Sequence, residues 1–238
     1  MKKNVWERLE SHPEIYLGQY IVPNFISNSV ALELSPEEHL VISPGEPLLS
    51  SWPFACPPED STLHIVMPNS FHYMGVNAWR KRFAKHTLYA HKGAIKRLTT
   101  KLALDKSEIC ALQETTPPLP NEYCFLFPPG HRAHDAWLKK DNGDNSSLWV
   151  TCDSFLNYDK VSNQPVARTL QKLLDAAPGL KISQVVKWLI LSERKEFKPW
   201  VLRQLELDKP TTLIPSHGEV KQCSDLKEQL SSLVAERL

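Results

Sequence analysis

The sequence has few glycines, no closely spaced cysteine pair and no long apolar run. Eight glycines in 238 residues leave no Gly-rich phosphate loop, and no G-x-S-x-G elbow is present. The five cysteines are odd in number and form no C-x-x-C pair, a pattern typical of buried free thiols. Phosphate-binding loops, serine-nucleophile elbows and zinc knuckles are therefore not indicated.

An excess of charge of one sign is also lacking. Lys and Arg number 28 against 27 Asp and Glu, so the net charge of +1 gives no electrostatic case for nucleic acid or an anionic membrane. No run approaches the roughly 18 apolar residues of a spanning helix, and the start, MKKNVWERLESHPEIYLG, has no signal-peptide core. We expect a cytoplasmic protein with no nucleic-acid and no membrane partner. The sequence carries no signal for an oligomeric state.

What is present is an ordinary globular composition, with 42% hydrophobic and 23% charged residues. Chain length and composition predict a single domain over residues 1–238. The 19 prolines gather in irregular connections, notably at 46–61 and 115–123. We interpret these as ordered coverings of sheet edges rather than as linkers.

The first half of the chain predicts strands followed by a strand–helix–strand unit. Residues 16–34 predict two strands around a turn at 23–29, and 39–43 predict a third strand. A strand from residue 63, a helix to about residue 85 and a strand at 87–92 then imply a parallel crossover.

The second half predicts a hairpin and then mostly helix. The runs on either side of the polar loop at 141–147 resemble two strands of one hairpin. Predicted helices at 166–177, 185–191 and 196–207 precede a strand at 211–216 and a last amphipathic helix. In these helices we expect the apolar stripe and two tryptophans to be packing residues: Val166, Leu170, Leu173, Leu174, Trp188 and Trp200.

Four potential metal ligands share one placement, since each follows an apolar strand-like run. They are His72, His131, Asp153 and His217. A lone histidine after a strand is more often structural, so it is the agreement in placement that points to a site. Histidines with one aspartate suit zinc, iron or manganese.

The motifs around these residues resemble the metallo-β-lactamase superfamily. The resemblance rests on Ser43-Pro44-Gly45, PPGHRAH at 128–134, LWVTCDSFLN at 148–157 and LIPSHG at 213–218, and it covers the chain from about residue 16 to its end. It implies an α/β fold, the αββα four-layer sandwich of that superfamily, with a dinuclear metal site on strand-end loops. The PNSFH wording also resembles an uncharacterised subgroup.

The superfamily's HxHxDH motif occupies residues 67–72 here and is largely replaced. Its first two histidines are Met67 and Asn69, its aspartate is Phe71, and only His72 is retained. His131 matches the next histidine ligand, Asp153 the bridging aspartate and His217 the final histidine. Ser43 stands where an acidic residue is usual.

The resemblance implies that these losses affect the two half-sites unequally. One half-site keeps only His131 and a share of Asp153, which is too few ligands for tight zinc, so we predict it to be empty. The other keeps His72, Asp153 and His217, a set that can hold one zinc or iron ion with positions left for water. Phe71 replaces the usual proton acceptor.

Two interpretations stay open. In the first, the protein is a mononuclear hydrolase of a small ester, thioester or lactone-like substrate. Asp153 and His131 are then catalytic, and His131 is a hydrogen-bond donor or weak metal ligand. Its substrate pocket would contain Asn69, Phe71, Tyr73 and His134, although surface exposure is the preferred reading of His134. In the second, the fold is a non-catalytic binding module without metal.

Overall fold

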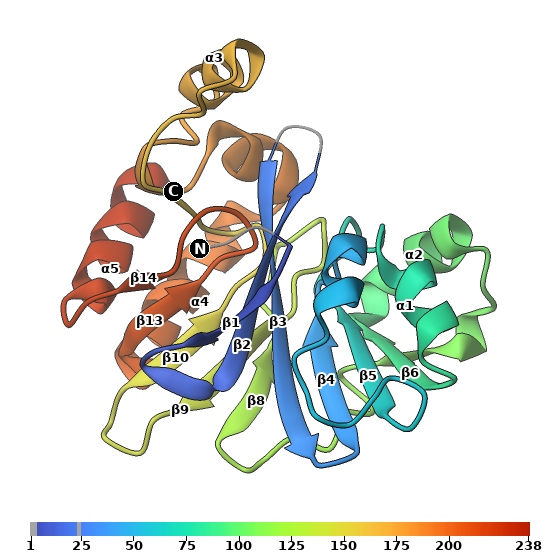
Figure 1. Ribbon diagram of the computed structural model, residues 1–238. Coiled ribbons are helices and arrows are strands. Elements are labelled where there is room, and N and C mark those ends of the chain that lie inside the picture. Colours follow the sequence, from blue (N-terminus) through green and yellow to red (C-terminus); the bar gives the residue numbers. More distant parts are fainter. Residues whose placement is uncertain (1–3, 23–24) are drawn as a thin grey trace. The chain divides into compact units, whose positions relative to one another are not determined.

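The structure is a computed structural model that describes residues 4–22 and 25–238. Residues 1–3, at the start of the N-terminal stretch, and 23 and 24, in the predicted turn, lie outside this description. The chain divides into two compact units, Met1–Pro120 and Asn121–Leu238 (Figure 1). Their boundary falls within the predicted proline-rich connection at 115–123, and the single domain over 1–238 stays a prediction.

Unit 1 contains a mixed sheet that changes from antiparallel to parallel pairing. Within its described residues seven strands pair in sequence order. The first four pair antiparallel, and β4 to β7 pair parallel. They are β1 (Trp6–Leu9), β2 (His12–Val22), β3 (Phe25–Ser35), β4 (Glu38–Ile42), β5 (Thr62–Met67), β6 (Lys85–Ala90) and β7 (Ile109–Ala111).

Along the sequence, the helices of unit 1 connect its parallel strands. They are η1 (Glu46–Ser51), α1 (Val76–Arg82), η2 (Lys92–Ala94), α2 (Ile95–Leu102) and η3 (Lys106–Glu108). Helix α1 buries Val76 and Trp79, and α2 buries Leu98 and Leu102, so each contributes one apolar face to the core under the sheet. The predicted crossover between β5 and β6 is confirmed.

Unit 2 contains a second mixed sheet. Among its described residues five strands pair in the order β14-β13-β10-β9-β8. The pairing of β10 with β13 is parallel and the other pairs are antiparallel. The strands are β8 (Tyr123–Leu126), β9 (Trp137–Asp141), β10 (Ser147–Val150), β13 (Pro210–Ile214) and β14 (Lys221–Gln222), and β11 (Leu156–Tyr158) and β12 (Gly179–Lys181) form a separate pair.

Helices α4 and α5 cover the sheet of unit 2. The helices of this unit are α3 (Pro165–Leu173), η4 (Val186–Ile190), α4 (Arg194–Asp208) and α5 (Leu226–Arg237). Helix α4 buries Phe197, Val201 and Leu205, and α5 buries residues at the same spacing of four. Both stripes pack with Trp137 and Trp149 of the sheet in one core.

The prediction that the apolar stripe of residues 166–174 is a packing face is wrong for most of its members. Val166, Leu170 and Leu173 are exposed, and so is Trp188, whereas Trp200 packs partly buried against the core. The sequence period correctly predicted a helix, but α3 turns Ala167 and Gln171 inward instead. Among the described residues, no helix combines the length and apolar character needed to cross a membrane.

Candidate metal centre

Asp153 and His217 come together because two neighbouring strands run parallel. Strand β10 pairs with β13 so that Val150 lies beside Ile214, and both strands end at the same edge of the sheet. Asp153 follows β10 by three residues and His217 follows β13 by three residues. The carboxyl ends of parallel strands are where α/β proteins gather functional side chains.

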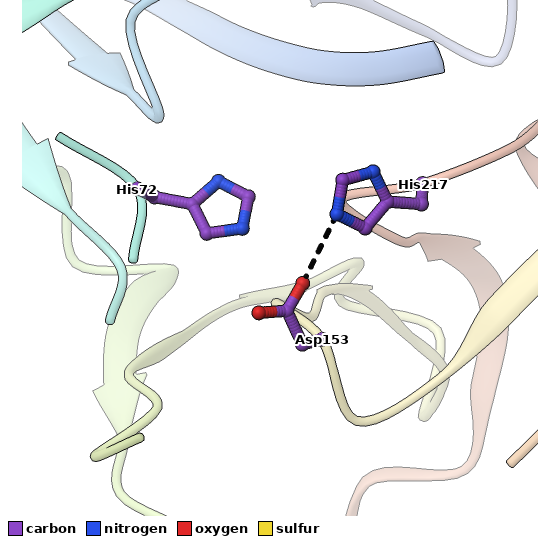
Figure 2. Close-up of side chains that lie close together, drawn as sticks. All are labelled: His72, Asp153 and His217. Carbon is purple, nitrogen blue, oxygen red and sulfur yellow. Dashed lines mark ion pairs between the residues drawn. The ribbon is translucent and has the colours of Figure 1, made fainter. Parts of the chain in front are cut away.

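Hydrogen bonds continue this pairing beyond the strand ends. The amide of Thr151 donates to the carbonyl of Ile214 at 2.9 Å, and the amide of Ser216 donates to the carbonyl of Cys152 at 3.2 Å. His217 Nε2 then lies 3.3 Å from Asp153 Oδ1 (Figure 2). Both side chains are partly exposed, at 19% and 15%, so the pair is open to a ligand from solvent.

Gly218 allows the chain to turn directly after His217. Its φ is +97°, and a Cβ at this position would lie 1.9 Å from the carbonyl oxygen of Asn157. The amide of Asn157 donates to the carbonyl of His217 at 3.3 Å, and its side-chain amide donates to the carbonyl of Glu219 at 2.9 Å. The loop that carries His217 is therefore held on both sides.

His72 is positioned in unit 1 by the same principle. Strands β4 and β5 are parallel, and the amide of Ser43, just after β4, donates to the carbonyl of Val66 in β5. The Ser43 hydroxyl is 2.8 Å from His72 Nδ1, so a hydrogen bond fixes that side of the ring. Gly75 packs so closely that a Cβ would lie 2.0 Å from the carbonyl oxygen of Pro44.

The other residues of the motif predicted at 67–72 have structural contacts. Met67 is fully buried in the core of unit 1. Asn69 is also buried, and its Oδ1 accepts hydrogen bonds from the amides of Phe71 at 2.7 Å and His72 at 3.2 Å. This side chain therefore shapes the turn that presents His72. Phe71 is 46% exposed, with the Arg97 guanidinium 4.8 Å from its ring centre.

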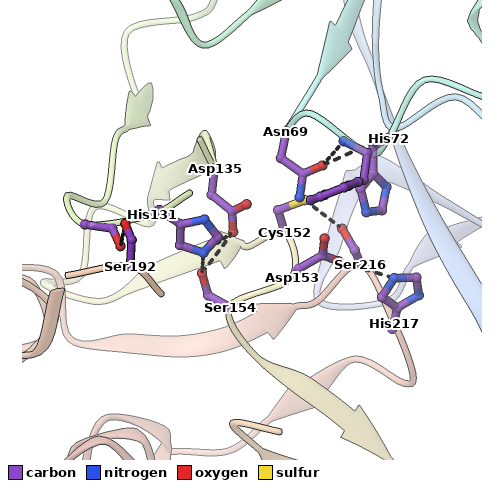
Figure 3. Close-up of polar contacts among 12 residues, drawn as sticks. Asn69, His72, His131, Asp135, Cys152, Asp153, Ser154, Ser192, Ser216 and His217 are labelled. Carbon is purple, nitrogen blue, oxygen red and sulfur yellow. Dashed lines mark hydrogen bonds and ion pairs between the residues drawn. The ribbon is translucent and has the colours of Figure 1, made fainter. Parts of the chain in front are cut away.

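His131 lies in a buried polar cluster of unit 2. Its Nε2 is 3.1 Å from the Ser154 hydroxyl and 3.2 Å from Asp135 Oδ2, and Ser154 donates to the same carboxylate oxygen at 2.9 Å (Figure 3). Its Nδ1 is buried with no hydrogen-bond partner among the described residues. Sequence reasoning missed Asp135 and Ser154, although Asp135 follows His131 by four residues and Ser154 adjoins Asp153.

The remaining predicted pocket residues lie in different surroundings. Tyr73 packs partly buried against the core of unit 1. His134 is partly buried with a φ of +59°, and burial, aided by nearby His131, lowers the pKa of its imidazole. Cys152 is buried beside Ser216, and burial raises the pKa of its thiol well above the usual range, so it is a neutral thiol. The assigned site roles stay predictions.

Comparisons with solved structures identify the fold. A putative diflavin flavoprotein fragment from Nostoc sp. matches with a TM-score of 0.65 and 12% identity, covering 98% of each chain. A metallo-beta-lactamase from Pontibacter korlensis gives 0.62 and 13%, covering 97% of this chain and 99% of its own. A mutant flavo di-iron protein from Thermotoga maritima gives 0.62 and 14%, covering 97% of this chain but 60% of its own.

No protein-family profile matches this sequence, and no curated protein matches it. The identities to the solved structures are low, so these similarities concern the fold. They agree with the mixed sheets and the helices of the two units. The α/β fold predicted from the sequence motifs is confirmed, and this chain has the fold of the metallo-β-lactamase superfamily.

Proposed function

We propose that this protein holds one metal ion on His72, Asp153 and His217 and hydrolyses a small ester, thioester or lactone-like substrate. The observation that carries the proposal is the Asp153–His217 pair, a carboxylate and an imidazole 3.3 Å apart and partly exposed at two parallel strand ends. His72, which belongs to unit 1, is the third ligand of the proposal, since its imidazole supplies one further nitrogen donor.

The chemistry of this group suits zinc or iron. Two imidazoles and one carboxylate are a common ligand set for a hydrolytic metal, because they leave coordination positions for water and substrate. Since Ser43 is hydrogen-bonded to Nδ1 of His72, Nε2 is the nitrogen that would bind the ion. We favour one ion over two because Met67 is buried in a core and Asn69 accepts from two backbone amides.

The side chains have separate roles in the proposed reaction. A bound zinc or iron ion supplies a water of lowered pKa and polarises the substrate carbonyl. Asp153 would serve as the proton acceptor, since Phe71 stands where the resemblance places the usual aspartate. His131 has a fully buried side chain, so in this proposal it supports Ser154 next to Asp153 and does not touch the substrate.

Metal analysis of protein purified without a His-tag tests the proposal. We expect about one equivalent of zinc or iron in the wild type, and its loss in His72→Ala and His217→Ala. His134→Ala is the matched control and should keep the metal. Absence of metal after reconstitution with zinc and with iron would contradict the proposal.

A second function is favoured by the pair formed by Phe71 and Arg97. This half-exposed aromatic ring, with a guanidinium 4.8 Å from its centre, is suited to contact a partner or ligand rather than to move a proton. The second candidate is thus a binding module without catalysis. A screen of generic esters, thioesters and lactones with the metal-loaded protein separates the two, because only the hydrolase turns a substrate over in a way that Asp153→Asn abolishes.

A further inference from the structure

Exposed apolar side chains gather in one stretch of unit 2, residues 161–195, which we call the apolar–basic segment. Nine large apolar residues are exposed in the described part of the chain, and five of them lie here. Exposed apolar residues grouped in this way mark interaction surfaces, whereas scattered ones are ordinary. The five are Val166, Leu170, Leu173, Trp188 and Leu189.

Helix α3 presents its large apolar residues outward. Val166, Leu170 and Leu173 share one helical face, and Leu173 is 74% exposed. The face turned inward carries the smaller Ala167 and the polar Gln171, whose Oε1 accepts from the amide of Ser162. In Figure 1, α3 stands apart from α4 and α5. A helix that packs by its small face leaves its large apolar face available for another surface.

The second apolar group is connected to the first through Gln184. The amide of Gln184 donates to the carbonyl of Leu174 at the end of α3 at 2.8 Å. Its side-chain oxygen accepts from Trp188 Nε1 at 2.9 Å. Trp188 is 60% exposed, as is Leu189 beside it, so η4 adds an aromatic and an aliphatic side chain to the same segment.

The charge of the segment differs from that of the chain. Residues 161–195 carry six basic and two acidic side chains, a net charge of +4, while the whole chain carries +1. One of the two acids, Asp175, is ion-paired with Lys181 and Arg237. The Arg194 guanidinium lies 4.3 Å from the centre of the Trp188 ring. Basic and apolar side chains therefore occur together, with little acidic charge to offset them.

We propose that the apolar–basic segment docks on an anionic lipid surface. Leucine and valine side chains would enter the boundary between headgroups and acyl chains, tryptophan would lie at the headgroup level, and lysine and arginine would contact the anionic headgroups. The expectation of no membrane partner relied on the net charge of the whole chain and on the absence of a spanning run. Neither describes a local surface, and docking of this kind is peripheral.

Co-sedimentation with lipid vesicles tests the proposal. Wild-type protein is mixed at low salt with vesicles of phosphatidylcholine alone or of phosphatidylcholine with phosphatidylglycerol. We expect binding to the anionic vesicles, weakened by added salt, and little binding to the neutral ones. Leu173→Glu should lower the partition coefficient roughly tenfold or more, because it places a charge in the apolar face.

Two further variants make the result specific. Leu207→Glu changes another exposed leucine, which lies in α4 outside the segment, and should leave vesicle binding unchanged. Lys172→Glu reverses an exposed charge on α3, whose side chain does not enter the core, and should weaken binding to anionic vesicles only. Circular dichroism checks that each variant is folded.

Failure of the folded wild type to bind anionic vesicles at low salt would overturn the proposal. Equal binding to neutral vesicles would overturn it as well, as would equal losses in Leu173→Glu and Leu207→Glu. If the wild type leaves vesicles unbound but self-associates in a way that Leu173→Glu prevents, the segment binds a second copy of the chain, and the lipid proposal is wrong.

Discussion

His39 is a fully buried imidazole among aromatic rings. The ring centres of Phe54 and Trp52 lie 4.3 Å and 5.2 Å away, and neither ring nitrogen of His39 has a hydrogen-bond partner among the described residues. Burial lowers the pKa of this imidazole to about 4 from the usual 6.5, and the nearby Glu38 carboxylate opposes part of the shift. The folded protein therefore keeps His39 neutral where the unfolded chain protonates it.

We predict that His39 makes the protein less stable in acid. Its contribution is fully present above pH 6.5 and is lost as the pH falls toward 4, because the unfolded state binds the proton more tightly in that window. The loss is on the order of 3 kcal/mol at the acid end. Urea unfolding from pH 7 to pH 4 should show a smaller decline in the free energy of unfolding for His39→Leu than for the wild type. The same decline in both would contradict this role.

Asp208 is a second buried residue whose partners can be tested. Its carboxylate accepts from Lys139 Nζ at 3.0 Å, Trp149 Nε1 at 3.1 Å and Gln204 Nε2 at 2.8 Å. Asp208→Ala should lower the free energy of unfolding by about 2–4 kcal/mol, because it leaves these donors without their acceptor. Glu206 lies in the same helix as Asp208 and forms an exposed ion pair with Lys227 of α5. Glu206→Ala removes this pair and should change the free energy of unfolding little. Urea unfolding measures both variants, and an equal loss of unfolding free energy in the two would mean that the burial of Asp208 does not matter.

The contact between side chains at strand ends was predictable from the sequence, whereas the contact between buried side chains was not. The sequence placed Asp153 and His217 after strands, and their 3.3 Å contact follows from the parallel pairing of those strands. The contact of His131 with Asp135 could not be foreseen, because it depends on a turn just after β8 that has no periodic signal. Side-chain partners across a turn require the backbone path, which sequence patterns do not give.

At the scale of elements, strands and helices with a buried face were the most predictable. Strands β4, β5 and β6 and helix α1 follow the predicted order, since apolar periodicity reflects burial against one core. Helix α3 was predicted to exist, but its packing face was predicted wrongly. A stripe of apolar residues indicates a face that avoids water in the functional state, and that face need not lie against the protein's own core.

The loop after β13 gives a prediction about an element rather than a side chain. Gly218→Ala should displace this loop, because the added Cβ would lie 1.9 Å from the Asn157 carbonyl oxygen and the residue has a φ of +97°. Gly143→Ala is a matched control, with a φ of +79° and nothing within 4 Å of the added Cβ. We expect Gly143→Ala to cost about 1 kcal/mol and to keep metal binding. Gly218→Ala should destabilise the protein more and should lose the metal.

Calorimetric unfolding and metal analysis of the two glycine variants check this prediction. Similar stability losses in both would mean that backbone conformation alone matters and that the close approach to Asn157 does not. Retention of the full metal content in Gly218→Ala would show that the His217 loop tolerates displacement. Either result would contradict the prediction.

At the scale of the molecule, composition and net charge predicted a globular protein but concealed differences between parts of its surface. A net charge of +1 describes the chain, yet residues 161–195 alone carry +4. Likewise, the motifs predicted the fold of the whole chain, but each pair of contacting side chains at strand ends forms within one of the two compact units. The composition of the whole chain averages over all its segments, so it cannot reveal one segment whose charge and apolar surface differ from those of the rest.

The proposed metal ion provides a final prediction at this scale, because its ligands come from both units. At a metal concentration about 100 times its dissociation constant, binding should stabilise the folded protein by about 2.7 kcal/mol. Hydrogen exchange measured by mass spectrometry should then slow in peptides around His72 as well as around Asp153 and His217. In His72→Ala, any remaining protection should be confined to the peptides of residues 121–238. Wild-type protein protected by metal only in those peptides would mean that His72 is not a ligand, and the proposed three-residue site would be wrong.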